Sequence, residues 1–155
     1  TIATALQRLR SGERGKKWFV LEGDSRPDAL LETPDVVICI EGKRTEAACT
    51  TSTSWMRRRS QLIRHMDAAL DVFPNRRILG MLVVEGFGGA EALDPSDHWI
   101  AESNAQYEGS MLDDSLPHRT PEERARVGGG VLGVTTWQFV CNATGVSWSD
   151  LPSAI

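Results

Sequence analysis

Apolar and polar positions follow a helical period at the start of the chain and then change to strand-like runs. Residues 2 to 10 carry apolar side chains at helical spacing, which predicts an N-terminal helix ending at Ser11 and Gly12. Residues 17 to 22 are rich in strand-forming types and end at Gly23. We therefore expect a helix followed by a first strand.

The stretch from residue 27 to residue 43 reads as two short strands around a turn. Residues 29 to 31 form the first apolar run, and residues 32 to 35, Glu-Thr-Pro-Asp, are typical of a turn. The β-branched run at residues 36 to 40 follows directly. This pattern predicts a β-hairpin.

Charged residues lie at the open end of this hairpin. Glu41 and Lys43 are two positions apart, so they share one face of their strand. A connection with an even number of residues would place Asp28 directly opposite Glu41. Two neighbouring carboxylates repel each other unless a cation lies between them, which favours a hard divalent ion such as Mg²⁺. The ammonium of Lys43 could orient a water molecule or neutralise a phosphate.

These residues resemble the motif of the PD-(D/E)xK nuclease superfamily, which has the restriction-endonuclease-like fold. The motif here consists of Pro27 and Asp28, twelve further residues, and then Glu41, Gly42 and Lys43. The resemblance implies that Asp28, Glu41 and the carbonyl of Gly42 hold Mg²⁺, with Mn²⁺ as a substitute. It also implies that Lys43 assists the attacking water. The alternative is a charged hairpin end that simply faces solvent.

The clearest helical period in the sequence runs from Trp55 to Phe73 and ends at Pro74. Four arginines make this the most basic predicted element, and next to a phosphodiesterase site they could grip phosphates. The alternative is a solvated charged face. The arginines are Arg57, Arg58, Arg59 and Arg64.

One polar flank of this predicted helix borders its apolar stripe and contains Arg58, Gln61 and His65. A helix packed on the sheet through that stripe could hold the flank over the charged end of the hairpin. In branches of the resembled superfamily a Gln or a basic residue on this helix completes the active site, and Gln61 fits that role. The alternative is that these are border residues that reach for solvent.

Residues 78 to 84 form a continuous apolar run, as expected of a strand buried on both faces. A strand, a crossover helix and a second strand make a parallel βαβ unit. The order of elements is then αβββαβ, the core of the resembled superfamily, with a mixed central sheet flanked by helices. The resemblance covers about residues 2 to 85.

The second half of the chain predicts helical additions to this α/β core. Ser96 is a cap for a helix reaching Tyr107, and residues 120 to 123, Thr-Pro-Glu-Glu, are a strong helix start. Residues 136 to 141 fit a helix or a strand, and the Gly that follows at position 145 favours a helix. The glycines at 128 to 130 read as a flexible connector.

Composition limits the class of protein. A chain of 155 residues suits one domain, residues 1 to 155, and 41% hydrophobic with 25% charged residues is ordinary. Its apolar runs are too short for a transmembrane helix, so we expect no membrane partner. A net charge of −4 argues against nucleic-acid binding over the whole surface but allows a local basic groove.

The cysteines and histidines bear on compartment and metal. Cys39, Cys49 and Cys141 are widely spaced and odd in number, which suits reduced thiols and a cytoplasmic location. The three histidines lack the paired spacing of a zinc site, so we expect no zinc.

The sequence therefore favours a magnesium-dependent nuclease whose partner is a nucleic acid, with DNA preferred, and in which a homodimer would serve to cut both strands. The main alternative is a non-catalytic module on the same fold that binds nucleic acid or protein. A hydrolase of a small phosphorylated substrate, which would need an enclosed pocket, ranks last because nothing in the sequence suggests a nucleotide-recognition loop.

Overall fold

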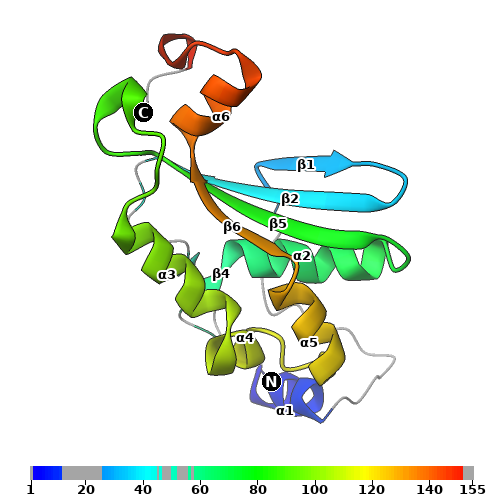
Figure 1. Ribbon diagram of the computed structural model, residues 1–155. Coiled ribbons are helices and arrows are strands. Elements are labelled where there is room, and N and C mark those ends of the chain that lie inside the picture. Colours follow the sequence, from blue (N-terminus) through cyan, green and yellow to red (C-terminus); the bar gives the residue numbers. More distant parts are fainter. Residues whose placement is uncertain are drawn as a thin grey trace.

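The fold is that of a computed structural model, which describes residues 2–11, 26–44, 46, 50–51, 56 and 58–151 (Figure 1). The strand expected at residues 17 to 22 lies outside these described residues, as do Arg57 and Cys49. The helix expected at the N-terminus is present as α1, Ile2–Arg10.

A mixed four-stranded sheet forms the centre of the fold (Figure 1). The first pair of strands is antiparallel and the other two pairs are parallel. Their order across the sheet is β1 (Ala29–Glu32), β2 (Val36–Lys43), β5 (Arg77–Val84) and β6 (Val131–Thr136). The expectation of an α/β protein with a mixed sheet is confirmed.

The hairpin pairs in the register that its turn predicts. Ala29 lies opposite Ile40, so the next pair outward brings Asp28 beside Glu41. On the other side of β2, Lys43 lies opposite Val84 in parallel register. The predicted βαβ unit is therefore present, and the carboxyl ends of β2 and β5 lie side by side.

The helix between them, α2, spans Gln61–Val72 and begins later than the sequence predicts. Ser60 caps it, because the Ser60 hydroxyl accepts a hydrogen bond from the backbone N–H of Ile63 at 3.3 Å. The two residues before the helix, Arg59–Ser60, form β4, which pairs with β3 at Thr50–Thr51. The assignment of Arg58 and Arg59 to the helix is wrong, and Arg64 is the described arginine of the cluster that belongs to it.

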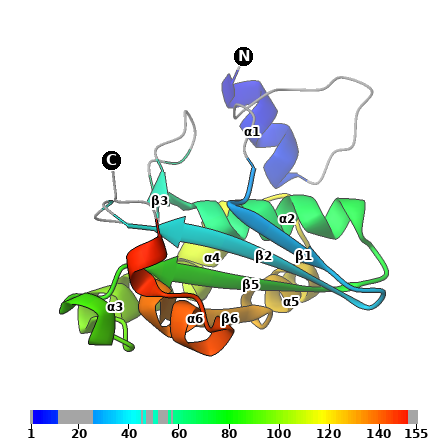
Figure 2. The same ribbon diagram turned by 90° about the horizontal axis from the view of Figure 1, so that it is seen from above.

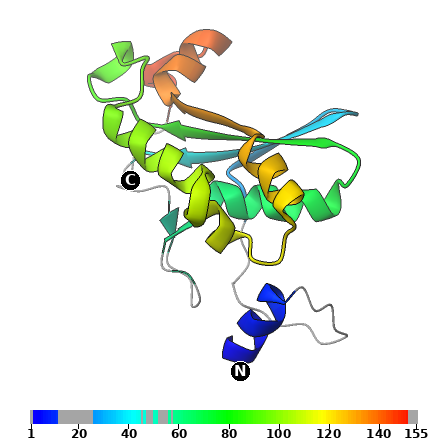
Figure 3. The ribbon, with the colours of Figure 1, turned by 60° about the horizontal axis from the view of Figure 1, so that its bottom comes forward.

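The core lies between the sheet and the helices that cover one side of it, chiefly α2 (Figure 3). Met66 packs so closely over Gly80 of β5 that a side chain at position 80 would collide with its sulfur. Figure 3 shows the sheet above α2, with the later helices α4 (Gly109–Ser115) and α5 (Pro121–Gly128) on the same side as α2. The most deeply buried apolar residues of this layer include Val37, Leu62, Ile63, Leu82 and Val84.

The helices of the second half mostly begin and end where the sequence predicts. Ser96 caps α3, Thr120 and Glu123 form the expected capping box of α5, and Gly145 ends α6 with a φ of 70°. These elements are α3 (Asp97–Tyr107), α4 (Gly109–Ser115), α5 (Pro121–Gly128), α6 (Trp137–Thr144) and the short 3₁₀ turns η1 (Gly89–Glu91) and η2 (Trp148–Asp150). Within the described residues, none of the helices is both long and apolar enough to cross a membrane.

The expectation of purely helical additions is wrong, because β6 is the fourth strand of the sheet. The triple glycine before it is a site of close packing, which corrects its interpretation as a flexible connector. The Gly130 carbonyl accepts a hydrogen bond from the N–H of Gly80 at 3.1 Å. A side chain at position 130 would collide with the carbonyl oxygen of Ile78.

Candidate active site

Glu41 and Lys43 form a buried ion pair on the face of β2 that packs against α2. Lys43 Nζ donates a hydrogen bond to Glu41 Oε1 at 2.7 Å, and the two side chains are 6% and 4% exposed. Burial alternates along β2, so the face that holds Val37 and Cys39 in the core continues into these two charges. Their shared face, expected from the sequence, is confirmed.

His65 of α2 also contacts Glu41. Its Nε2 lies 3.2 Å from Glu41 Oε2, and the imidazole is buried. The distance suits an ion pair, but Oε2 of Glu41 accepts no hydrogen bond of good geometry from the described part of the chain. The sequence predicts that Gln61 completes the site from this helix, and Gln61 precedes His65 by one helical turn. The sequence did indicate this position, because Gln61 and His65 both lie on the predicted polar flank of the helix.

The charge of Glu41 is set by these neighbours. Burial alone would raise the pKa of its carboxyl group, because a charge is poorly solvated inside the fold. The contacts with His65 and Lys43 outweigh that effect, and the pKa of Glu41 lies below its ordinary value. Glu41 is therefore a carboxylate at neutral pH, held by one ammonium and one imidazole.

Asp28 is linked to the Glu41–Lys43 pair through the backbone of the residue between them, Gly42. Its Oδ2 accepts a hydrogen bond from the N–H of Gly42 at 2.7 Å, where β1 has ended and the edge of β2 would be unpaired. Its side chain is exposed, in contrast to Glu41 and Lys43. The three predicted residues thus gather around Gly42, but Asp28 lies at the strand edge instead of joining the buried pair.

Trp137, the first residue of α6, covers Gly42. A Cβ at position 42 would lie 2.5 Å from Cζ2 of Trp137 and 3.5 Å from Oδ2 of Asp28. Position 42 must therefore be glycine for the indole to pack on the strand. The sequence gives no local sign of this contact, because it joins residues that are far apart along the chain.

A second layer of charges surrounds the site. Arg44 Nε donates to Glu85 Oε2 at 3.0 Å, and its guanidinium lies 5.3 Å from the ring centre of Trp148. Oε1 of Glu46 lies 3.8 Å from Nζ of Lys43. The rim therefore combines acidic and basic groups instead of forming one basic surface.

The predicted phosphate-binding arginines have different environments. Arg58 is exposed and donates to both carboxylate oxygens of Glu102, at 3.2 and 3.0 Å. Arg59 is buried and donates to Asp67 Oδ2 at 3.3 Å, so it is an internal residue and not a surface contact. Arg64 is half-buried on α2. Among the described arginines, Arg59 is therefore not part of a basic surface, which corrects its prediction as a phosphate contact.

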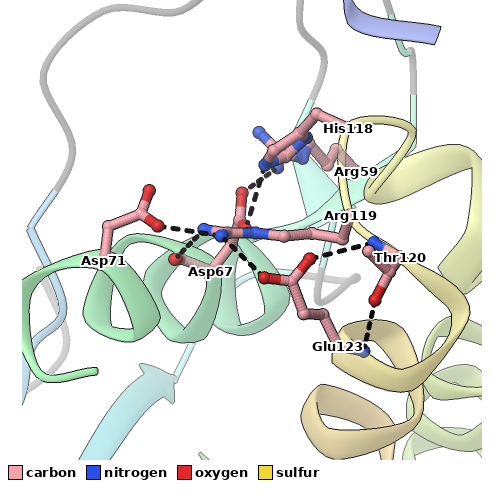
Figure 4. Close-up of polar contacts among 7 residues, drawn as sticks. All are labelled: Arg59, Asp67, Asp71, His118, Arg119, Thr120 and Glu123. Carbon is pink, nitrogen blue, oxygen red and sulfur yellow. Dashed lines mark hydrogen bonds and ion pairs between the residues drawn. The ribbon is translucent and has the colours of Figure 1, made fainter. Parts of the chain in front are cut away.

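Asp67 is the centre of a separate ion network that ties α2 to the segment between α4 and α5 (Figure 4). Besides Arg59, it accepts from Arg119 Nε at 2.7 Å and lies 3.2 Å from Nε2 of His118. Arg119 also donates to Asp71 at 2.8 Å. Burial alone would raise the pKa of Asp67, but its contacts with His118 and Arg119 lower it overall. We interpret the network as structural, because its charged groups are paired with one another.

The donors expected to bind a metal are all oxygens, which are the ligands Mg²⁺ prefers. They are the carboxylates of Asp28 and Glu41 and the carbonyl of Gly42. Glu41 is ionised, and its Oε2 lacks a well-aligned hydrogen bond, so the donor set fits a hard cation. Residues 26–44 and 58–151, with the shorter described stretches, contain no cluster of three His, Cys, Asp or Glu side chains arranged for a metal.

Comparisons with known proteins add no family assignment. No family model matches the chain, and no curated protein and no solved structure matches it either.

Proposed function

We propose that this protein is a magnesium-dependent nuclease that hydrolyses phosphodiester bonds, with DNA as the preferred substrate. The observation that carries the proposal is the Glu41–Lys43 pair, 2.7 Å apart at the carboxyl end of β2, with Asp28 bonded to the residue between them. A carboxylate, a glycine and a lysine on a strand next to an aspartate fit the PD-(D/E)xK motif. The mixed sheet with a hairpin and a parallel crossover is compatible with a restriction-endonuclease-like arrangement.

Each residue of the site has a distinct role in this proposal. Asp28, Glu41 and the Gly42 carbonyl would hold Mg²⁺, or Mn²⁺ in its place; a bound ion supplies charge neutralisation and a more acidic water. Lys43 places a positive charge beside the phosphate and orients the attacking water. His65 keeps the Glu41 carboxylate in place from the side of α2.

Substrate contacts outside the site are assigned to the arginines near the start of α2. Arg57, Arg58 and Arg64 would bind phosphates, whereas Arg59 is held by Asp67 and does not take part. Gln61 keeps its proposed role beside the site, since it lies on the same side of α2 as His65. A homodimer would provide the second site needed to cut both strands of a duplex.

A non-catalytic binding module is the second candidate. It is favoured by the partners of Glu41, because Lys43 and His65 together could hold β2 against α2 without any metal. Such a protein would bind nucleic acid or a protein partner equally well in the presence of EDTA.

Cleavage assays separate the two candidates. The protein is incubated with linear DNA, circular DNA and RNA, with MgCl₂ or with EDTA. The nuclease proposal expects cleavage in MgCl₂, none in EDTA, and loss of cleavage in Asp28→Asn. Because Asp28 is exposed, this variant should fold normally. Asp35→Asn, an equal change of charge in the hairpin turn at the other end of the strands, is the matched control and should remain active. If none of the three substrates is cut in either buffer, the nuclease proposal fails.

A further inference from the structure

The loop that follows β5 presents an exposed aromatic ring. Phe87 is 82% exposed and is the one residue with a side chain in the sequence Gly86-Phe87-Gly88-Gly89. A single exposed apolar residue is common on protein surfaces and means little alone. The loop around Phe87 is different, because its backbone is held in a fixed conformation.

A buried glutamine holds the loop on both sides of Phe87. Gln138 of α6 is 2% exposed, and its Nε2 donates to the carbonyls of Gly86 and Gly89, both at 3.1 Å. Its Oε1 accepts from the N–H of Gly86 at 3.0 Å. Three hydrogen bonds from one side chain thus fix the backbone before and after the ring.

The glycines of the loop are required by its shape. A Cβ at Gly86 would lie 2.5 Å from the carbonyl oxygen of Ala92. Gly88 and Gly89 have φ values of 124° and 77°, which side-chain-bearing residues rarely adopt. The ring of Phe87 consequently projects from a fixed backbone whose adjacent positions have no side chains.

The loop begins at the same end of the sheet as the candidate active site. The N–H of Glu85 donates to the carbonyl of Lys43 at 2.9 Å, and Phe87 follows two residues later. Figures 1 and 2 show the segment after β5 running beside α6, next to the carboxyl ends of β2 and β5. The hydrogen bond from Glu85 to Lys43 therefore ties the start of this loop to the strand end that carries the candidate site.

We propose that Phe87 is a stacking platform for an unpaired base of the nucleic acid bound at this site, so that the substrate is single-stranded or has an unpaired end. Every base has a flat aromatic face, and stacking on an aromatic side chain is tolerant of sequence. A ring on a backbone already fixed by Gln138 loses little freedom when a base stacks on it. The inference rests on the proposed function, because it names the substrate class of that site.

Binding measured without cleavage tests the platform. Fluorescence anisotropy in EDTA compares a labelled single-stranded oligonucleotide with a blunt duplex of the same sequence. Phe87→Ala should weaken binding of the single strand on the order of tenfold and leave duplex binding nearly unchanged. Phe87→Trp should preserve the affinity, and Phe87→Leu should lose it, because leucine keeps apolar area but cannot stack.

Matched controls exclude a general surface effect. Val72 at the end of α2 is 67% exposed and lies at the far end of the sheet, so Val72→Ala should not change the affinity. The fluorescence of a 2-aminopurine base in the single strand should change on binding to the wild type and change less with Phe87→Ala. Circular dichroism should show that both alanine variants fold.

Three results would overturn the platform: equal single-strand affinity of Phe87→Ala and wild type, full affinity of Phe87→Leu, or no binding of the single strand by the wild type. Full affinity of Phe87→Leu would indicate an apolar contact, as for a protein partner. The platform and the nuclease proposal can fail separately. If binding depends on Phe87 but the protein cleaves nothing in MgCl₂, only the proposed nuclease activity is rejected. Cleavage in MgCl₂ with unchanged Phe87→Ala binding rejects only the platform.

Discussion

At the scale of single residues, the site is defined by two charges that have almost no contact with water. Removing a charge from water is unfavourable by several kcal/mol, and the mutual attraction of Glu41 and Lys43 offsets much of it. Pairs of this kind contribute little net stability, yet the loss of one partner leaves the other uncompensated. The nuclease proposal gives this pair a chemical role at the end of an otherwise apolar strand face.

Lys43→Ala tests that view directly. We expect cleavage to fall on the order of a hundredfold, because a positioned charge at the reacting phosphate is lost. Metal affinity should stay near normal, since a protonated lysine is not a ligand and a bound ion would itself supply the counter-charge that Glu41 loses. Single-turnover rates and calorimetric titration with MnCl₂ measure the two effects, and a fully active variant would refute the role of Lys43.

Asp67 provides a second residue-scale test, on stability and its pH dependence. Asp67→Asn should lower the free energy of unfolding at pH 7 by about 3 kcal/mol, because Arg59 and Arg119 lose a buried counter-charge. The folded pKa of Asp67 is lowered, so the wild type binds fewer protons at this group than the unfolded chain. The stabilisation is complete above the ordinary aspartate pKa, about 3.9, and disappears as the pH falls through the lowered value.

Urea unfolding of the wild type and Asp67→Asn at several pH values measures the pH range over which Asp67 stabilises the fold. The difference between them should be constant near neutral pH and should shrink in acid. Asp71→Asn removes an exposed carboxylate from the same network and should change stability by about 1 kcal/mol or less. An equal loss in both variants would contradict the assignment of Asp67 as the centre of the network.

At the scale of elements, the hairpin could be predicted from the sequence because its signals are local. The even turn and the alternation of β2 fix the register, and parity alone places Glu41 and Lys43 on one face. The start of α2 was misplaced because Trp55 extends the helical period by chance, whereas the cap at Ser60 decides where the helix begins.

The parts of the site that the sequence did not predict depend on contacts between distant elements. Trp137 over Gly42 joins α6 to β2, and the partner of Glu41 on α2 depends on how that helix is rotated. Asp28 lies just beyond the last β1–β2 pair, so pairing no longer dictates where its side chain points. The strand β6 was not predicted because it follows three glycines and Gly133, with a φ of 100°, interrupts its run of strand-forming residues.

Gly130→Ala tests the role of those glycines in docking β6. A methyl group at this position would meet the carbonyl oxygen of Ile78, a backbone atom that cannot move aside as a flexible side chain can. We expect the free energy of unfolding to fall by about 1–3 kcal/mol, as for other overpacked sites. Gly129→Ala is the milder comparison, since Gly129 is exposed, has a helical φ of −69°, and a Cβ there would lie 3.1 Å from the Ala125 carbonyl oxygen. Chemical unfolding should show a smaller change in Gly129→Ala than in Gly130→Ala; an unaffected Gly130→Ala would restore the interpretation as a loose connector.

At the scale of the whole molecule, the candidate site joins segments far apart in the sequence. Glu41 comes from β2, His65 from α2 and Trp137 from α6, and their contacts with one another or with Gly42 hold these elements at one end of the sheet. An ion bound by Asp28 and Glu41 would bind only the folded chain, because the unfolded chain does not bring these donors together. Metal binding should therefore raise the stability of the entire fold.

Thermal unfolding in MgCl₂ measures this coupling without requiring catalysis. At a concentration about 100 times the dissociation constant, the ion should add about 2.7 kcal/mol to the free energy of unfolding. For a chain of this size that corresponds to an increase in Tm of roughly 5–10 °C. Asp28→Asn should abolish most of the increase while leaving the Tm without metal nearly unchanged, because Asp28 is exposed. Asp35→Asn and NaCl at matched ionic strength control for charge and screening; the same increase in Asp28→Asn and wild type would place the ion elsewhere.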